Sequence, residues 1–236
     1  MNISLALLSI SSFGRSPQFS FSNTQQLKSI TFHQINSNHF LKQFMFVSSD
    51  YFTITFKQST FKNFLKVPIK IRSSHLSART KNLDLSLANE FITSHISYTE
   101  SALNVNSCLF ENCLSNSYGG AIEYVSEQGQ LTVNSTSFNS CSSTFKSAAI
   151  YLNGNYSTEI ATFTHSSTIQ HCCFMDCIGK DYGITCFLCS FTSELNNSYS
   201  VGCHNVPNSL GLYPFQVISR KFYSEYFNIS KSNLPQ

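Results

Sequence analysis

The chain has 236 residues, a formal net charge of +3 and only 11% charged residues, against roughly 25% in ordinary soluble domains. Its polar surface is therefore built from uncharged side chains, chiefly 41 Ser, 21 Asn and 17 Thr. Ser and Asn are poor helix formers, whereas the 22 Phe and 11 Tyr favour strands, which excludes a helical bundle. The small, scattered positive charge argues against a nucleic-acid-binding surface. An apolar content of 42% excludes wholesale disorder.

The N-terminal segment, residues 1–23, contains a short apolar stretch from Ile3 to Phe13. This stretch fits the apolar region of a secretory signal peptide, and it fits equally a first strand that caps the fold or a start inside a longer protein. No apolar run in the chain reaches the roughly 18 residues that a membrane span needs. We therefore expect no membrane span in this chain.

Internal repeats begin after this segment. Residues 30–42 (ITFHQINSNHFLK) and 54–66 (ITFKQSTFKNFLK) are identical at seven of thirteen positions, at an offset of 24. The same skeleton returns without gaps in LNVNSCLFENC (103–113), LTVNSTSFNSC (131–141) and STIQHCCFMDC (167–177). A shared Phe aligns these units at Phe61, Phe110, Phe138 and Phe174. The third position after it is Cys in the last three units, at Cys113, Cys141 and Cys177.

Each unit reads as strand, bend, short strand, loop and second strand. Apolar residues stand seven and five positions before the shared Phe, which is the period of two of a strand with one buried face. The Phe itself lies an odd number of residues further on, so it would point to the other face of a straight strand. The chain must therefore bend between them. A second apolar segment follows, as in GGAIEY (119–124), where Gly119 and Gly120 suit a corner with positive φ. Between Phe61 and Phe110 the spacing leaves room for one more turn, holding Leu83, Leu85, Phe91 and Ile96.

These repeats predict an all-β fold. Units of about 24 residues bury their apolar faces by stacking, each strand pairing in parallel with its equivalent one turn away. We predict a right-handed single-stranded parallel β-helix, a solenoid of about six to seven coils, over residues 24–205. The alternative, an antiparallel sandwich, needs hairpin turns, and the chain has one Asn-Gly dipeptide. Residues 206–236 do not follow the repeat and are expected to form a C-terminal cap or tail.

The nine cysteines allow three interpretations. Equivalent positions on neighbouring coils lie about 4.8 Å apart, which permits stacked disulfides, but buried Cys also packs as a small apolar residue, and we favour packing. Structural zinc is a third candidate, because Cys173, Cys177, Cys186 and Cys189 have spacings that overlap those of zinc sites. The repeat positions already account for Cys173 and Cys177, so we predict no metal and no cofactor.

The motifs GGAI (119–122) and FENC (110–113) give the sequence a family resemblance. It resembles the polymorphic outer membrane protein type of repeat, with its GGA-[ILV] and F-x-x-N signatures, and is similar to large families of putative surface proteins of trichomonad protists. The likeness covers about residues 30–205, but only one GGAI is intact, and Cys replaces the Asn of F-x-x-N. The resemblance implies a surface protein with a role in adhesion.

The candidate function is binding without catalysis, at the cell surface or outside the cell, with an unknown host or extracellular protein or glycan as partner. The runner-up is a pectate-lyase-like carbohydrate-processing enzyme, which needs clustered carboxylates. The repeat alignment places no two of the twelve carboxylates on neighbouring rungs of one face, although long loops could join Glu159 to Asp181. A further alternative is a fragment of a larger, anchored surface protein. If the chain is secreted, the glycosylation candidates are Asn134, Asn155, Asn196 and Asn228.

Overall fold

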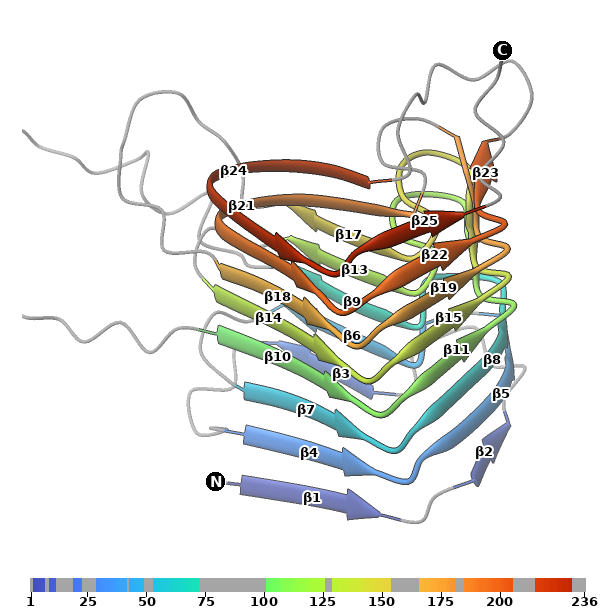
Figure 1. Cartoon of the computed structure of the whole chain (residues 1–236). Helices are drawn as coiled ribbons and strands as arrows, with labels where there is room; N and C mark the ends of the chain where they lie inside the picture. Colours follow the sequence, from blue (N-terminus) through green and yellow to red (C-terminus); the bar gives the residue numbers. More distant parts are fainter. Residues whose placement is uncertain are drawn as a thin grey trace, which may run out of the picture.

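The computed structural model describes most of the chain as strands, with turns and bends between them. The described residues are 2–6, 9–11, 19–22, 29–41, 43–48, 53–72, 101–125, 129–153, 166–180, 185–205 and 215–230. They include no helix, which agrees with the all-β class predicted from composition. All strand pairings among them are parallel (Figure 1).

The strands form three sheets. The largest has the spatial order β1 (Asn2–Ala6), β4 (Ser29–His33), β7 (Thr53–Lys57), β10 (Ser101–Asn106), β14 (Gly129–Asn134), β18 (Ser166–Gln170), β21 (Cys186–Asn196), β17 (Ile150–Asn153), β13 (Ile122–Val125), β9 (Ile69–Arg72), β6 (Met45–Ser48) and β3 (Phe19–Ser22), with β24 (Phe215–Glu225) paired to β21. The second has β2 (Ser9–Ser11), β5 (Asn36–Phe40), β8 (Thr60–Phe64), β11 (Leu109–Glu111), β15 (Ser137–Asn139), β19 (Cys173–Met175), β22 (Tyr199–Val201) and β25 (Asn228–Ser230). The third has β12 (Leu114–Ser115), β16 (Ser142–Ser143), β20 (Ile178–Gly179) and β23 (His204–Asn205).

The largest sheet curls back on itself because β21 belongs to both of its halves. Residues 186–189 pair with β17, whereas residues 192–196 pair with β18. We call the half from β1 to β18 face 1, the eight-stranded sheet face 2, and the half from β3 to β17 face 3; β21 and β24 continue both face 3 and face 1. The chain passes through faces 1, 2 and 3 in turn and returns to face 1 one strand further along (Figure 1). Each such circuit is a rung.

Equivalent residues of successive rungs lie in register and fill the core. Leu103 pairs with Leu131 and Val105 with Val133, and strand β14 pairs in the same way with β18, as the alignment predicts. On face 2, the aligned Phe side chains stack ring on ring with centroid separations of 4.9, 5.1 and 5.0 Å. The stacked rings are those of Phe61, Phe110, Phe138 and Phe174, all fully buried.

Two residues in each complete repeat have left-handed backbone conformation and produce the bend that the sequence pattern requires. One lies three residues before the aligned Phe and the other two residues after it, as Ser107 and Asn112 do in one rung and Ser135 and Ser140 in the next, with φ between 50° and 53°. The first separates face 1 from face 2 and resets the alternation of side chains. The core-facing residues of both faces therefore point to the same interior.

The alignment is wrong in the interval between Phe61 and Phe110. It places a further turn there, whereas the structure pairs β7 directly with β10 and β8 directly with β11. Leu83, Leu85, Phe91 and Ile96, which were expected in that turn, lie outside the described residues. The register of two paired strands does not depend on the length of the segment that joins them, because loop-closure entropy grows slowly with length.

The stack includes both end segments of the chain: strands in the N-terminal segment agree with the alternative of a first strand that caps the fold, and at the C-terminal end the stack extends further than the sequence predicts. Strands β1 and β2 pair with β4 and β5, and β24 and β25 pair with β21 and β22. Face 2 thus contains eight strands, more than the six to seven coils expected. The expectation that the tail departs from the repeat is wrong for residues 215–230, where Ile229 takes the place of the aligned Phe and hides the register.

The Phe stack predicts a specific loss of stability. We expect Phe138→Ala to lower the free energy of unfolding by about 3–5 kcal/mol, because truncating a buried Phe removes its apolar contacts and leaves a cavity. Phe145→Ala is the matched control, since Phe145 is 54% exposed, and we expect it to cost less than about 1 kcal/mol. Urea unfolding measures both, and equal losses in the two variants would contradict the stack.

Candidate binding surface

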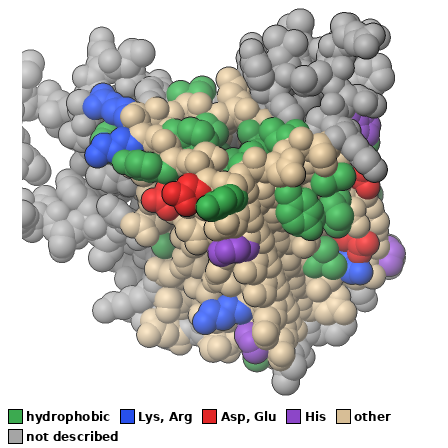
Figure 2. All heavy atoms as spheres, in the orientation of Figure 1, with side chains coloured by type: hydrophobic (Ala, Val, Ile, Leu, Met, Phe, Trp, Pro, Cys, Tyr) green, Lys and Arg blue, Asp and Glu red, His purple; other side chains and the backbone are tan. Residues whose placement is uncertain are grey.

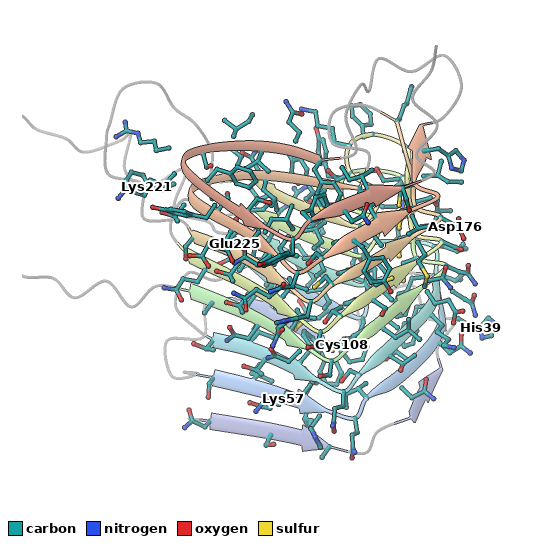
Figure 3. The ribbon with its side chains drawn as sticks, in the orientation of Figure 1. His39, Lys57, Cys108, Asp176, Lys221 and Glu225 are labelled. Carbon is teal, nitrogen blue, oxygen red and sulfur yellow. The ribbon has the colours of Figure 1, made fainter. Side chains whose placement is uncertain are left out.

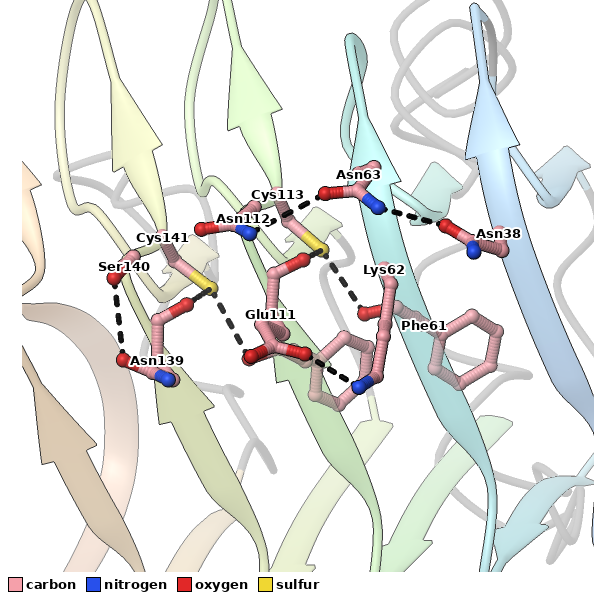
Figure 4. A network of polar contacts seen from close by, with 11 residues as sticks. Asn38, Phe61, Lys62, Asn63, Glu111, Asn112, Cys113, Asn139, Ser140 and Cys141 are labelled. Carbon is pink, nitrogen blue, oxygen red and sulfur yellow. Dashed lines mark hydrogen bonds and ion pairs between the residues drawn. The ribbon is translucent and has the colours of Figure 1, made fainter.

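The predicted Cys positions form a buried column beside the Phe stack. Cys113, Cys141 and Cys177 are fully buried, and Cys203 extends the column by one rung. Each thiol lies within hydrogen-bonding distance of the carbonyl of an aligned residue one rung back; the Cys113 Sγ, for example, is 3.5 Å from the Phe61 carbonyl oxygen (Figure 4). None of the nine cysteines forms a disulfide, and all nine are buried. The structure therefore has the packed arrangement that we favoured over stacked disulfides.

Burial governs the chemistry of these thiols. It raises the pKa of Cys108 to about 11 and that of Cys172 to about 12, and burial followed by the neighbouring Cys113 raises the pKa of Cys141. A thiol in this state is a poor nucleophile and a poor metal ligand, because both roles need the thiolate. Within the described residues, no group of three or more His, Cys, Asp or Glu side chains is arranged to hold a metal ion.

The two predicted corner glycines have different roles. Gly119 has a φ of +57°, as expected, and a Cβ there would lie 2.1 Å from the Ile122 carbonyl oxygen. Gly120 does not have positive φ, so the prediction is wrong for this residue. Glycine is required at position 120 because a Cβ would lie 2.0 Å from the Ala148 carbonyl oxygen of the next rung. The close approach of two rungs, and not the backbone angle, selects it.

The outer sides of faces 1 and 2 carry few charges, and most of the surface seen in Figure 2 is uncharged. At the second corner of two rungs, side-chain amides join successive rungs: Asn63 donates to Asn38, the residue before the corner of the preceding rung, at 2.8 Å, and Asn112 donates to Asn63 at 3.3 Å (Figure 4). Beside them, Lys62 pairs with Glu111 at 2.6 Å. His39 and Asp176 occupy the same corner position on other rungs (Figure 3). The side-chain amides of this corner form a polar ladder of uncharged groups beside one ion pair.

The outer side of face 3 is different, because it holds a carboxylate between two cations. Glu123 on β13 is fully buried; one carboxylate oxygen accepts a hydrogen bond of 2.6 Å from Lys70 Nζ, and the other accepts one of 2.9 Å from Arg72 Nη2. The Lys70 side chain is 13% exposed, whereas that of Arg72 is 50% exposed. The group has one positive charge in excess, and Arg72 presents it to solvent.

Aromatic side chains adjoin this ion group. Tyr151 on β17 is the register neighbour of Glu123, and its ring stacks on that of Tyr118 at 4.5 Å. Tyr118 also contacts the ring edge of Phe145 at 5.6 Å. Burial, followed by the neighbouring Tyr118, raises the pKa of Tyr151 to about 12, so its hydroxyl stays protonated. We call these side chains the outer-face cluster: Lys70, Arg72, Tyr118, Glu123, Phe145 and Tyr151.

The sequence analysis did not find this cluster, although the signal was present. The second apolar segments VPIKI, GGAIEY and SAAIYL align, and their alignment already places Lys70, Glu123 and Tyr151 at one outward position of neighbouring rungs. Attention to outward positions would therefore have paired Lys70 with Glu123. The alignment does not mark Arg72 or Tyr118. Arg72 is the register partner of Val125 and reaches Glu123 diagonally, and Tyr118 lies in the loop before β13.

The expectation that no two carboxylates lie on neighbouring rungs of one face is wrong. Glu194 on β21 and Glu225 on β24 both project from the outer side of face 1, at register positions two residues apart on adjacent rungs (Figure 3 labels Glu225). The repeat alignment missed the pair because it ended before residue 206. The other pair considered, Glu159 with Asp181, lies outside the described residues.

The glycosylation candidates differ in accessibility. Asn228 is exposed, whereas Asn134 and Asn196 are half-buried. The side-chain oxygen of Asn196, Oδ1, also accepts a hydrogen bond from the Glu225 backbone amide. Asn155 lies outside the described residues. Asn228 is thus the most accessible of the described acceptor sites.

Comparison with known proteins gives no relative: no protein-family model, no curated protein and no solved structure matches the chain. Within the described part of the chain there is no helix with the length and hydrophobicity that crossing a membrane takes.

The ion group of the outer-face cluster predicts a clear difference between two Glu→Gln substitutions. We expect Glu123→Gln to lower the free energy of unfolding by about 2–3 kcal/mol, less than the loss of a wholly buried pair because Arg72 is half exposed. Glu111→Gln removes the corresponding charge from the exposed pair with Lys62, and we expect a loss below about 1 kcal/mol. Urea unfolding of both variants is the measurement. A larger loss for Glu111→Gln would show that burial does not set the strength of these pairs.

The thiols predict slow chemical modification. We expect iodoacetamide at pH 8 to label the folded protein far more slowly than the protein unfolded in guanidinium, because all nine thiols are buried and the raised pKa of thiols such as Cys108 and Cys141 suppresses the thiolate. Cys173 should react first, since its side chain lies at the outward position next to Tyr199. Mass spectrometry of the labelled protein counts the modified residues. Rapid labelling of Cys141 or Cys177 in folded protein would contradict the buried column.

Proposed function

We propose that the chain is a right-handed single-stranded parallel β-helix that acts at the cell surface or outside the cell and binds a protein or glycan ligand without catalysing a reaction. The parallel pairing of every described strand and the regular return of the chain to face 1 support the β-helix. The right hand follows from the strong preference of parallel crossovers. Burial of all nine thiols suits an oxidising compartment, because buried thiols resist oxidation.

The outer-face cluster is the observation that supports binding. It runs from an exposed guanidinium, Arg72, through Glu123, Tyr151 and Tyr118 to an exposed aromatic ring, Phe145. A surface with a cation at one end and an aromatic ring at the other suits an extended ligand that carries both an anion and an apolar surface. Glu123 is unsuited to acid–base catalysis, because it is fully buried and both of its oxygens already accept hydrogen bonds. The positive charge in excess favours an acidic ligand, and acidic glycans have this chemistry.

The alternative, a carbohydrate-processing enzyme, is favoured by one observation: Glu194 and Glu225 lie on neighbouring rungs. Glycosidases use two carboxylates on opposite sides of the scissile bond. Here both side chains project from the same outer face, beside Asn196 and Tyr223 in register, and Glu225 is exposed. A positioned general acid usually works from a buried site or beside a close charge, and Glu225 lies on an exposed surface.

One assay separates binding from catalysis. We expect immobilised hyaluronate or polygalacturonate to retain the protein and soluble polysaccharide to keep its chain length, with or without calcium. Arg72→Gln should weaken retention about tenfold, the loss of one good charged contact, whereas Lys62→Gln on face 2 should leave it unchanged. Release of reducing ends or unsaturated sugars that stops in Glu194→Gln or Glu225→Gln would establish the enzyme instead.

A further inference from the structure

The last rung of the stack has core-facing side chains that remain exposed. Phe222 on β24 and Ile229 on β25 occupy the register positions of Ser193 and Ser200, which are fully buried. Yet Phe222 is 49% exposed and Ile229 is 43% exposed. Their side chains are directed toward the core, and what they lack is a further rung to cover them. Apolar groups in this position favour association that removes them from water.

The backbone at this end is open as well. Among the described strands, residues 221–225 of β24 pair only with β21, and β25 pairs only with β22. At the opposite end, β1 pairs only with β4, and β2 pairs only with β5 (Figure 1). An open strand edge presents unpaired N–H and C=O groups that accept another strand. The first rung is open on one side and the last rung on the other. These are the two sides that meet wherever one rung stacks on the next within the chain.

From these two observations we propose that the partner of the last rung is the first rung of a second copy of this chain, stacked end to end. The register that runs through the whole stack defines the contact: residues 221–225 would pair with 2–6, and residues 228–230 would pair with 9–11. In that register Phe222 takes Ile3 as its pairing partner and Ile229 takes Ile10, whereas Ser224 takes Leu5. Among the outward pairs, Lys221 meets Asn2 and Glu225 meets Ala6, and no like charges face each other.

The geometry of this contact determines the kind of assembly. The surfaces that meet are different, which makes the interface heterologous. A second copy that uses its first rung leaves its own last rung open, so association continues and forms linear chains instead of a closed dimer. Interfaces of this kind form by the same parallel pairing that already joins rungs within the chain.

Sedimentation equilibrium over a range of protein concentrations tests the proposal. We expect the average mass of the full chain to rise with concentration past that of a dimer. Ile229→Lys blocks the last rung and Leu5→Lys blocks the first, because an inward-facing charge on an edge strand opposes pairing; Leu5 is half-buried and lies in register with the core residue Phe32. Each variant alone should stay monomeric, and an equimolar mixture of the two should form dimers and stop there. Leu65→Lys, at an exposed position away from both ends, is the control and should associate like the unchanged chain.

Several results would overturn the proposal. They are a monomer at all concentrations of the unchanged chain, a mass that saturates at a dimer, or a mixture of the two blocked variants that stays monomeric. Circular dichroism checks that each variant is folded. If Ile229→Lys unfolds, Phe222→Ser replaces it, because the rung beneath already carries Ser193 at that position, and undiminished association of this folded variant would also contradict the contact.

Discussion

The left-handed corner residues are the constraint on which the rest of the structure depends. A non-glycine residue in this conformation costs about 1–2 kcal/mol, and two occur in each complete repeat. The stack offsets that cost, because the corner N–H groups donate to the next rung: Ser107 to the Asn134 carbonyl and Ser135 to the Gln170 carbonyl, both at 3.0 Å. A single repeat has no such acceptor. The bend and the stacking of rungs therefore stabilise each other, and neither is expected to form alone.

The residue after the first corner shows what this arrangement demands of the sequence. From the rung of Ser59 to the rung of Ser198 this residue is a small, buried Ser, Thr or Cys that is able to donate, whereas Ile35 and Phe227 hold the position on two other described rungs. Thr136 donates to the Asn134 carbonyl and accepts from the Cys108 backbone amide, and Ser198 does the same for Asn196 and Cys172. The Cys108 thiol donates to Asn106 in the same manner. Ser, Thr and Cys exchange here because each supplies a short donor, which accounts for part of the Cys content without disulfides or metal.

The sequence predicts those parts of the fold in which one rung repeats the chemistry of the next. Phe110 and Phe138 could be aligned because a fully buried column tolerates few side chains, and the register of faces 1 and 2 follows from them. The last rungs could not be predicted, since Ser200 and Ile229 replace the Phe there. Ile229 is partly exposed, and the ring of Phe215, from another strand, packs on Phe174 with the centroids 5.4 Å apart. Glu123 was missed for the opposite reason. The repeat alignment gives its position, but a Glu stands there on one rung only, and its importance depends on cations contributed by another rung.

The spacing of rungs also explains why a chain of this kind has so few charges. Equivalent outward residues repeat at about 4.8 Å, and two like charges about 4 Å apart repel by about 1 kcal/mol in water and about 4 kcal/mol near a protein surface. A charge is therefore tolerated opposite a neutral residue or an opposite charge, as in Lys62 with Glu111 and Lys70 with Glu123. No paired positions of the described strands set Asp or Glu against Asp or Glu, or Lys or Arg against Lys or Arg. Uncharged Ser, Thr and Asn are the default on such a surface. Pairing across rungs accounts for Lys70 opposite Glu123 but not for the second cation, Arg72, which leaves one positive charge in excess. That excess charge is the physical reason for which we propose the outer-face cluster as the binding site.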